Sequence, residues 1–160
     1  MTLANEQYTR DYKPINHMKT ILYLFIALSG LSHAGVLSLH KVVKKDAKGA
    51  IQYNLNKEVI LLEKTPFISE DMVQQAKVRP NKINHIVITL NKAGTRKMHE
   101  VTGAMNHGVD RVGILVNGKI TQAPVVNAQL GSVFELALPE TFTLGEAIAF
   151  INALNNAPKG

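Results

Sequence analysis

The sequence predicts a small α+β domain with a mostly antiparallel sheet, helices packed on one face of that sheet and a ferredoxin-like character. Three observations favour this class. Apolar and polar residues alternate in several short segments, which is the period of a pleated strand. Two other segments, around 91–105 and 143–154, carry apolar residues at helical spacing instead. Finally, Asn117-Gly118 separates two strand-like segments, and it is a strong hairpin signal because both residues tolerate a positive φ.

The composition bounds the domain and its chemistry. The 160 residues have a net charge of +6, a hydrophobic content of 46% and no cysteine. This length suits one domain, which we place at residues 35–160. Without cysteine there is no disulfide, no thiolate metal site and no lipid anchor on cysteine. Lysines cluster only at 41–48, either as a solvated segment or as a patch for anionic lipid or nucleic acid. The absence of interleaved aromatic residues favours the first reading, and we expect no nucleic-acid partner.

Residues 1–34 are interpreted as an N-terminal extension followed by a secretory signal peptide. Lys19 supplies the positive flank and Ser32-His33-Ala34 a small-x-small cleavage site. The apolar run Ile21–Leu31 has about 11 residues, against the roughly 20 that a membrane-spanning helix needs. We therefore expect cleavage, a periplasmic or otherwise exported protein, and no stable membrane insertion after cleavage. An uncleaved N-terminal anchor is the alternative, and translation could start at Met18 as well as at the first residue.

The first half of the domain is expected to contain strands, one short helix and a linker. Ser69 is a good helix N-cap, and Glu70 and Asp71 suit the positive end of a helix dipole. Ile68 and Val73 are spaced for a hydrophobic staple across this cap. The expected ranges are strands within 35–43 and 51–62, a helix from 69 to just before Arg79-Pro80, and a linker at 80–84.

The second half is expected to hold three further strand regions and two helices. Asn91 can cap the first of these helices, which would bury Met98, Val101 and Met105. Gly94, in its first turn, is explained either by tight backbone packing or by the approach of a ligand, and packing is the default. The expected strands are 86–90, 112–116 with its partner 119–126, and 133–138.

The closing helix is predicted from a capping box formed by Thr143 and Glu146. Gly145, in its first turn, is the one residue there that disfavours a helix, by about 1 kcal/mol relative to alanine. The buried face is expected to comprise Leu144, Ala147, Ile148, Ile151 and Leu154.

No catalytic motif is found. His99-Glu100 begins like a metalloprotease motif, but the next histidine, His107, lies eight residues on instead of four. GxSxG, the P-loop, GxGxxG and a cysteine nucleophile are all absent from the sequence. We therefore expect no enzyme activity, no cofactor and no bound metal, and we read His99 and His107 as surface or hydrogen-bonded side chains.

Three blocks of sequence resemble a known family. LNKAGTRKMHEVT, RVGILVNGKITQAPVV and FTLGEAIAFINAL occur in this order and at suitable spacing. Together they resemble the first periplasmic domain, the head subdomain, of SecD, the accessory subunit of the bacterial protein-export translocase. The clear match covers 84–154, and 59–76 is similar more weakly. Unlike SecD, a polytopic membrane protein, this sequence has no further apolar span after the signal segment.

The resemblance implies a non-catalytic module that binds unfolded exported polypeptide or docks on membrane subunits of the translocase. Sheet edges and hairpins are suited to pairing with an extended peptide. The alternative is a small-ligand or cell-envelope binding domain that merely shares the fold, and a hydrolase is a distant third. The candidate protein-binding residues lie in one hairpin: Asn117, Gly118, Lys119, Thr121, Ala123 and Pro124.

Overall fold

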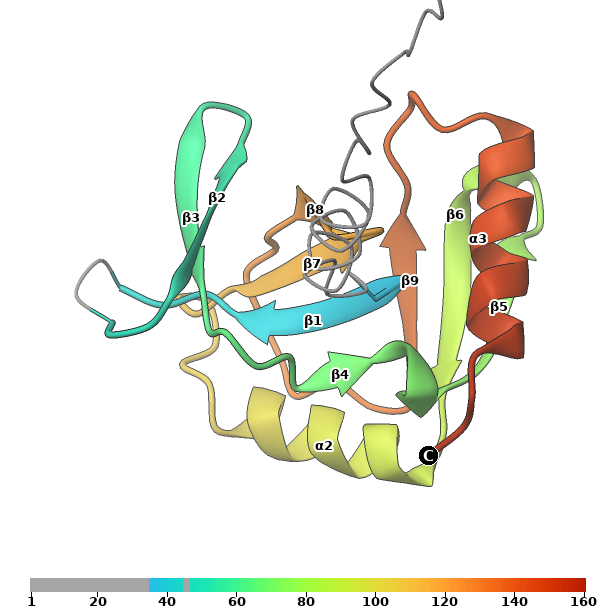
Figure 1. Cartoon of the computed structure of the whole chain (residues 1–160). Coiled ribbons are helices and arrows are strands. Elements are labelled where there is room, and N and C mark those ends of the chain that lie inside the picture. The colour runs from blue at the N-terminus through green and yellow to red at the C-terminus, as the bar shows by residue number, and fades with distance from the viewer. Residues whose placement is uncertain (1–34, 45–46) are drawn as a thin grey trace, which may run out of the picture. The chain divides into compact units, whose positions relative to one another are not determined.

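The computed structural model describes residues 35–44 and 47–160, so the extension and signal segment expected at 1–34 lie outside the described residues. The described chain forms the small, mostly antiparallel α+β domain that the sequence predicts (Figure 1). Its elements are β1 (Leu37–Lys41), β2 (Ile51–Leu55), β3 (Glu58–Leu62), β4 (Ile68–Ser69), the 3-10 helix η1 (Glu70–Met72), β5 (Val73–Arg79), β6 (Lys82–Leu90), α2 (Lys92–Gly103), β7 (Val112–Val116), β8 (Lys119–Gln122), β9 (Val133–Ala137) and α3 (Leu144–Asn156).

The strands make two main sheets and a separate hairpin. The four-stranded sheet has the order β4-β1-β7-β8, and the three-stranded sheet has the order β5-β6-β9. Strands β2 and β3 pair only with each other as named strands. Every pairing is antiparallel, with Leu39 opposite Ile114 in the first sheet and Ile86 opposite Leu136 in the second. Strands β8 and β9 are therefore both edge strands.

One apolar core joins the two sheets and the two helices. Alternate side chains of each sheet meet the inner faces of α2 and α3, and Leu37, Ile86 and Met98 are fully buried there. In Figure 1, α3 lies along β5 and β6, and α2 lies beside β4 and η1. Burial of a large apolar side chain stabilises a fold by roughly 1.5–3 kcal/mol. This core is consequently the main source of stability in a chain without disulfides.

The β2–β3 hairpin covers the opposite face of the four-stranded sheet. Ile60 and Leu62 pack there against Leu115 and Ala123 in a second, smaller apolar cluster. Gly113 makes room for this contact, because a Cβ atom at that position would overlap with the side chain of Leu62. Strand β7 is therefore buried on both faces, which makes it the centre of this half of the domain.

The helix expected around 91–105 and its cap are confirmed, but α2 ends at Gly103, so Met105 lies beyond the helix and is only partly buried. Asn91 accepts a hydrogen bond of 2.9 Å from the backbone N–H of Gly94, and Met98 and Val101 are buried. A Cβ atom at Gly94 would lie 2.9 Å from Cβ of Met72 and 3.0 Å from its carbonyl oxygen. Tight packing is thus the reason for glycine at this position.

The helix expected after Ser69 is wrong. Only the 3-10 turn η1 follows, Ser69 makes no side-chain cap, and residues 73–79 form strand β5. The linker expected at 80–84 is wrong as well, since β6 already begins at Lys82. A register shift between Val73 and Gln75 places the buried residues Val73 and Ala76 three apart, a spacing that imitates a helix.

The closing helix is confirmed, whereas its expected buried face is wrong in part. Thr143 and Glu146 form the complete capping box. The buried side chains are Ala147, Phe150 and Leu154, while Leu144 and Ile148 are 52% and 46% exposed. The helix presents its Phe150 side to β5, and this leaves two of the five expected residues facing solvent. No helix among the described residues has the length and apolar character that crossing a membrane requires.

Candidate binding groove

The β7–β8 hairpin has the tight turn that its sequence predicts. Asn117 and Gly118 adopt φ angles of 50° and 74°, the left-handed values that a primed turn requires. Lys119 follows on β8 and is exposed. Thr121 sits where the register shifts, and its hydroxyl donates a hydrogen bond of 3.2 Å to the carbonyl of Ile114. This bulge twists the edge strand.

A groove of about 460 Å³ runs beside this hairpin. One wall is formed by the hairpin and the other by the connection from β9 to α3 together with the first turn of α3. The hairpin wall consists of Val116, Asn117, Lys119, Ile120 and Thr121, and the opposite wall of Pro139, Thr141, Phe142 and Glu146.

The groove combines apolar surface with two opposite charges. Ile120 and Phe142 are half-buried and supply apolar contact area, while Lys119 and Glu146 are exposed on opposite walls. The backbone N–H of Thr143, followed by its hydroxyl, donates to the Glu146 carboxylate and lowers the pKa of Glu146 below its ordinary value of 4.5. Glu146 is therefore ionised at neutral pH. A groove of this kind suits an extended chain that carries apolar side chains and polar backbone groups.

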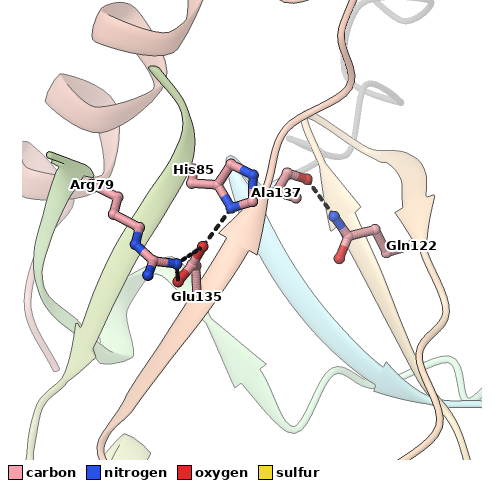
Figure 2. Close-up of polar contacts among 5 residues, drawn as sticks. All are labelled: Arg79, His85, Gln122, Glu135 and Ala137. Carbon is pink, nitrogen blue, oxygen red and sulfur yellow. Dashed lines mark hydrogen bonds and ion pairs between the residues drawn. The ribbon is translucent and has the colours of Figure 1, made fainter. Parts of the chain in front are cut away.

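The two edge strands come together near this groove. The side-chain amide of Gln122, the last residue of β8, donates a hydrogen bond to the backbone carbonyl of Ala137, the last residue of β9 (Figure 2). This contact links the four-stranded sheet to the three-stranded sheet through their edges. The Gln122 amide also takes the place that a backbone N–H would occupy if a further strand paired with β9.

A cluster of charged and titratable side chains lies on the solvent-facing side of the three-stranded sheet. Arg79 Nη1 donates to both carboxylate oxygens of Glu135, at 2.8 and 2.5 Å, and the ring nitrogen Nδ1 of His85 contacts Oε1 (Figure 2). The hydrogen bond from Arg79 is the main cause of a lowered pKa at Glu135, and His85 adds to it. Glu135 is consequently held as a carboxylate, which makes it unsuited to act as a proton donor at neutral pH.

The hairpin residues singled out from the sequence have different surroundings. The structure brings Asn117, Lys119 and Thr121 to the groove. Ala123 is 9% exposed, and its carbonyl accepts a hydrogen bond of 2.7 Å from Nε of Arg111. Pro124 is exposed and lies outside the groove lining. It follows the end of β8 at Gln122, so the strand expected at 119–126 is shorter than predicted, although the Pro124 carbonyl still accepts a hydrogen bond from the N–H of Val112.

The opposite wall of the groove and the link between the two edges are not predictable from the sequence. In the sequence, Phe142 and Glu146 belong only to the closing-helix block and its capping box. Gln122 stands between the candidate residues Thr121 and Ala123, but no local sequence pattern marks it as a contact residue. Its partner Ala137 is 15 residues away, and no periodicity predicts that contact.

The histidines make hydrogen bonds to protein groups. His99 Nδ1 accepts a bond of 3.0 Å from the side-chain amide of Gln129, and His107 Nε2 lies 3.1 Å from the carbonyl oxygen of Thr102. Across residues 35–44 and 47–160, no three His, Cys, Asp or Glu side chains are grouped closely enough to hold a metal ion. That the protein binds no metal stays a prediction, which elemental analysis of untagged protein can test.

A different hollow, of about 490 Å³, lies along the outer face of α2. All five of its lining residues, from Lys92 to Glu100, come from this single helix. A hollow with only one wall encloses little of a ligand's surface. The groove beside the β7–β8 hairpin, which has two walls, is therefore the better candidate binding site.

Comparisons with known proteins agree with this architecture. A family model described as the SecDF P1 head subdomain matches residues 41–155. The crystal structure of SecDF in its super-membrane-facing form is 21% identical, has a TM-score of 0.57, and the match covers 82% of this chain and 20% of that chain. A second structure, of SecDF as a membrane component that enhances protein export, is 18% identical with a TM-score of 0.57 and coverage of 91% and 71%.

These identities establish a shared fold and nothing finer. The chain spans only a fifth of the length of the first of these SecDF structures. No curated protein matches the chain.

Proposed function

The chain belongs to the family of SecDF P1 head subdomains, and from this premise we propose that it is a non-catalytic binding module of protein export. Its ligand is an extended, unfolded segment of an exported polypeptide, which it holds in the groove between the β7–β8 hairpin and the start of α3. The observation that carries this proposal is the groove itself, because an edge strand forms one of its walls.

The chemistry of the groove supports an extended ligand. An edge strand offers unpaired backbone N–H and C=O groups, which recognise any extended chain independently of its side chains. Ile120 and Phe142 add apolar contacts of low specificity, as binding of many different sequences requires. Affinity should be modest, since ordering a flexible chain consumes much of the contact energy.

The place of action follows from the same premise. SecDF is described as a membrane component that enhances protein export. We propose that this chain acts on the exported side of the membrane, in the periplasm, where polypeptides emerge in unfolded form. The signal-like segment at 18–34 supports that location. Docking of the module on a membrane subunit of the translocase is compatible with this role.

Site-specific photocrosslinking tests the proposal. A photoreactive residue at position 119, on the groove wall, should trap an unfolded exported precursor or a translocase membrane subunit. The same residue at position 92, an exposed lysine position at the start of α2, is the matched control and should trap neither.

The pattern of crosslinks decides between the readings. Crosslinks from position 119 that form equally well with the folded form of the same protein would contradict recognition of unfolded chains. Absence of any polypeptide crosslink would instead favour the small-ligand or cell-envelope alternative.

A further inference from the structure

The two edges of the three-stranded sheet are closed to different degrees. At β5, the side chain of Asn155 on α3 reaches the backbone of Ala76. Its Oδ1 accepts from the Ala76 N–H at 2.7 Å, and its Nδ2 donates to the Ala76 carbonyl at 3.0 Å. The N–H and C=O of Ala76, which point away from β6, are both hydrogen-bonded in this way, as they would be by a neighbouring strand. This is a device that blocks pairing of a foreign strand with β5.

The outer edge of β9 has no such double closure. Leu90 donates to the carbonyl of Ser132 at 2.8 Å and Leu138 donates to the carbonyl of Asn84 at 2.6 Å, on either side of the β6–β9 ladder. In an antiparallel pair, a residue directs its N–H and C=O to the same side, and successive residues alternate. The backbone groups of Val133, Glu135 and Ala137 therefore point away from β6.

Only one of these outward groups has a protein partner in the described chain. The Gln122 side chain donates to the carbonyl of Ala137, as a backbone N–H of an added strand would (Figure 2). The neighbouring side chain of Val133 is 55% exposed. Among the outward backbone groups of β9, the carbonyl of Ala137 is therefore the one that a hydrogen bond from the described chain already covers.

We propose that the outer edge of β9, residues 133–137, accepts an extended polypeptide segment as an additional strand, and that Gln122 is the contact which this segment displaces. The inference rests on the proposed function and names a second element that holds the ligand. The segment it fits alternates apolar and polar side chains. Its apolar side would continue the face of Phe134 and Leu136, and its polar side the face of Glu135.

Amide hydrogen exchange measured by NMR tests this placement residue by residue. The probe is a twelve-residue peptide of alternating valine and threonine with a lysine pair at each end. At about 90% occupancy, exchange at the outward amides of Val133, Glu135 and Ala137 should slow about tenfold. The inward amides of Phe134 and Leu136, already paired with β6, should change little and serve as the internal control.

Substitutions at the edge provide a second readout. Val133→Pro removes an outward N–H that the fold does not use, and proline is tolerated at such edge positions. It should weaken binding of the peptide about tenfold, whereas Val133→Ala should not. Should Val133→Pro fail to fold, the wild-type protein is tested with a peptide N-methylated at alternate residues. Methylation on the edge-facing amides should then abolish binding, and methylation in the other register should not.

Gln122→Ala should have the opposite effect, because it frees the carbonyl of Ala137. Loss of one competing hydrogen bond corresponds to about twofold to tenfold tighter binding. The matched control is Gln129→Ala, which removes a side-chain amide that donates to the carbonyl of His99 on α2. That variant should bind the peptide with unchanged affinity.

The possible outcomes separate this inference from the proposed function. Peptide binding that leaves the amides of Val133, Glu135 and Ala137 unprotected, and that Val133→Pro does not weaken, overturns the inference while the groove remains a binding site. No binding of any unfolded chain overturns both. Protection of these amides without peptide, rising with protein concentration, would show that a second copy of the chain occupies the edge, which also overturns it.

Discussion

Arg111 holds Glu58 by two hydrogen bonds, Nη1 to Oε1 at 2.5 Å and Nη2 to Oε2 at 3.2 Å, although the residues are 53 positions apart. Glu58 begins β3 and Arg111 directly precedes β7, so the pair ties the β2–β3 hairpin to the four-stranded sheet. The third donor of Arg111, Nε, bonds the carbonyl of Ala123 just after β8. The Arg111 guanidinium group thus joins the β2–β3 hairpin to the end of β8, the strand that forms one wall of the groove.

Replacement of Arg111 by alanine should loosen the hairpin without unfolding the domain. Amide exchange in β2 and β3 should accelerate about twofold to fivefold, because an exposed ion pair contributes modestly. Exchange in β5, β6 and β9 should stay the same, since these strands lie in the other sheet. Arg96→Ala, on the exposed face of α2, is the control. An equal effect on both sheets would show that Arg111 supports the whole domain instead.

The same pair should be visible as a pH effect. The hydrogen bond from Arg111 lowers the pKa of Glu58 below its ordinary value of 4.5. A carboxyl whose pKa is lower in the folded state stabilises the fold above its ordinary pKa, and this contribution is lost as the pH falls through the lowered value. NMR titration of the Glu58 carboxyl carbon should give a midpoint below 4.5, which Arg111→Ala should raise. An identical midpoint in both proteins would contradict the pairing in solution.

Introducing a charge at different positions of α2 and α3 tests which side of each helix is buried. Met98 is fully buried, so Met98→Asp should lower the free energy of unfolding by more than about 3 kcal/mol. Ile148 is 46% exposed, and Ile148→Asp should have a much smaller effect. Lys92→Ala, on the solvent side of α2, should change stability by less than about 0.5 kcal/mol. Chemical denaturation that finds Ile148→Asp as damaging as Met98→Asp would contradict the observed orientation of α3.

Two glycines near helix starts should respond to alanine in opposite directions. At Gly94 a Cβ atom would lie 3.0 Å from the Met72 carbonyl oxygen, so Gly94→Ala should destabilise by about 1–3 kcal/mol. At Gly145 the nearest atom would be Thr143 Oγ1, 3.9 Å away. Gly145→Ala should therefore stabilise the protein by up to about 1 kcal/mol, through the better helix propensity of alanine. Thermal melts compare the two, and shifts of the same sign would contradict the packing at Gly94.

Local signals in the sequence were sufficient for much of this fold. Asn117-Gly118, the Asn91 cap and the Thr143–Glu146 capping box each depend on residues within a few positions, and all three are confirmed. The helix expected after Ser69 is wrong because its cap residue and the acidic residues Glu70 and Asp71 begin only the short 3-10 turn η1, and strand β5 follows directly.

Long-range contacts could not be read in the same way. Leu144 and Ile148 are as apolar as the residues that are buried on α3, and only packing against β5 selects the face. Likewise, the groove depends on the hairpin and the start of α3 meeting in space, and the Gln122–Ala137 contact depends on two sheet edges meeting. Tertiary structure, not local pattern, creates these features.

The most direct measurement of the central claim is the affinity of this chain for one protein in two states. A permanently unfolded form of an exported protein, labelled with a fluorophore, is titrated with this protein, and the folded form is titrated in parallel. The unfolded form should bind and the folded form should not. Ile120→Asp, in the groove, should abolish binding of the unfolded form. Equal binding of both forms, or binding of the unfolded form that Ile120→Asp leaves intact, would contradict recognition of extended chains in this groove.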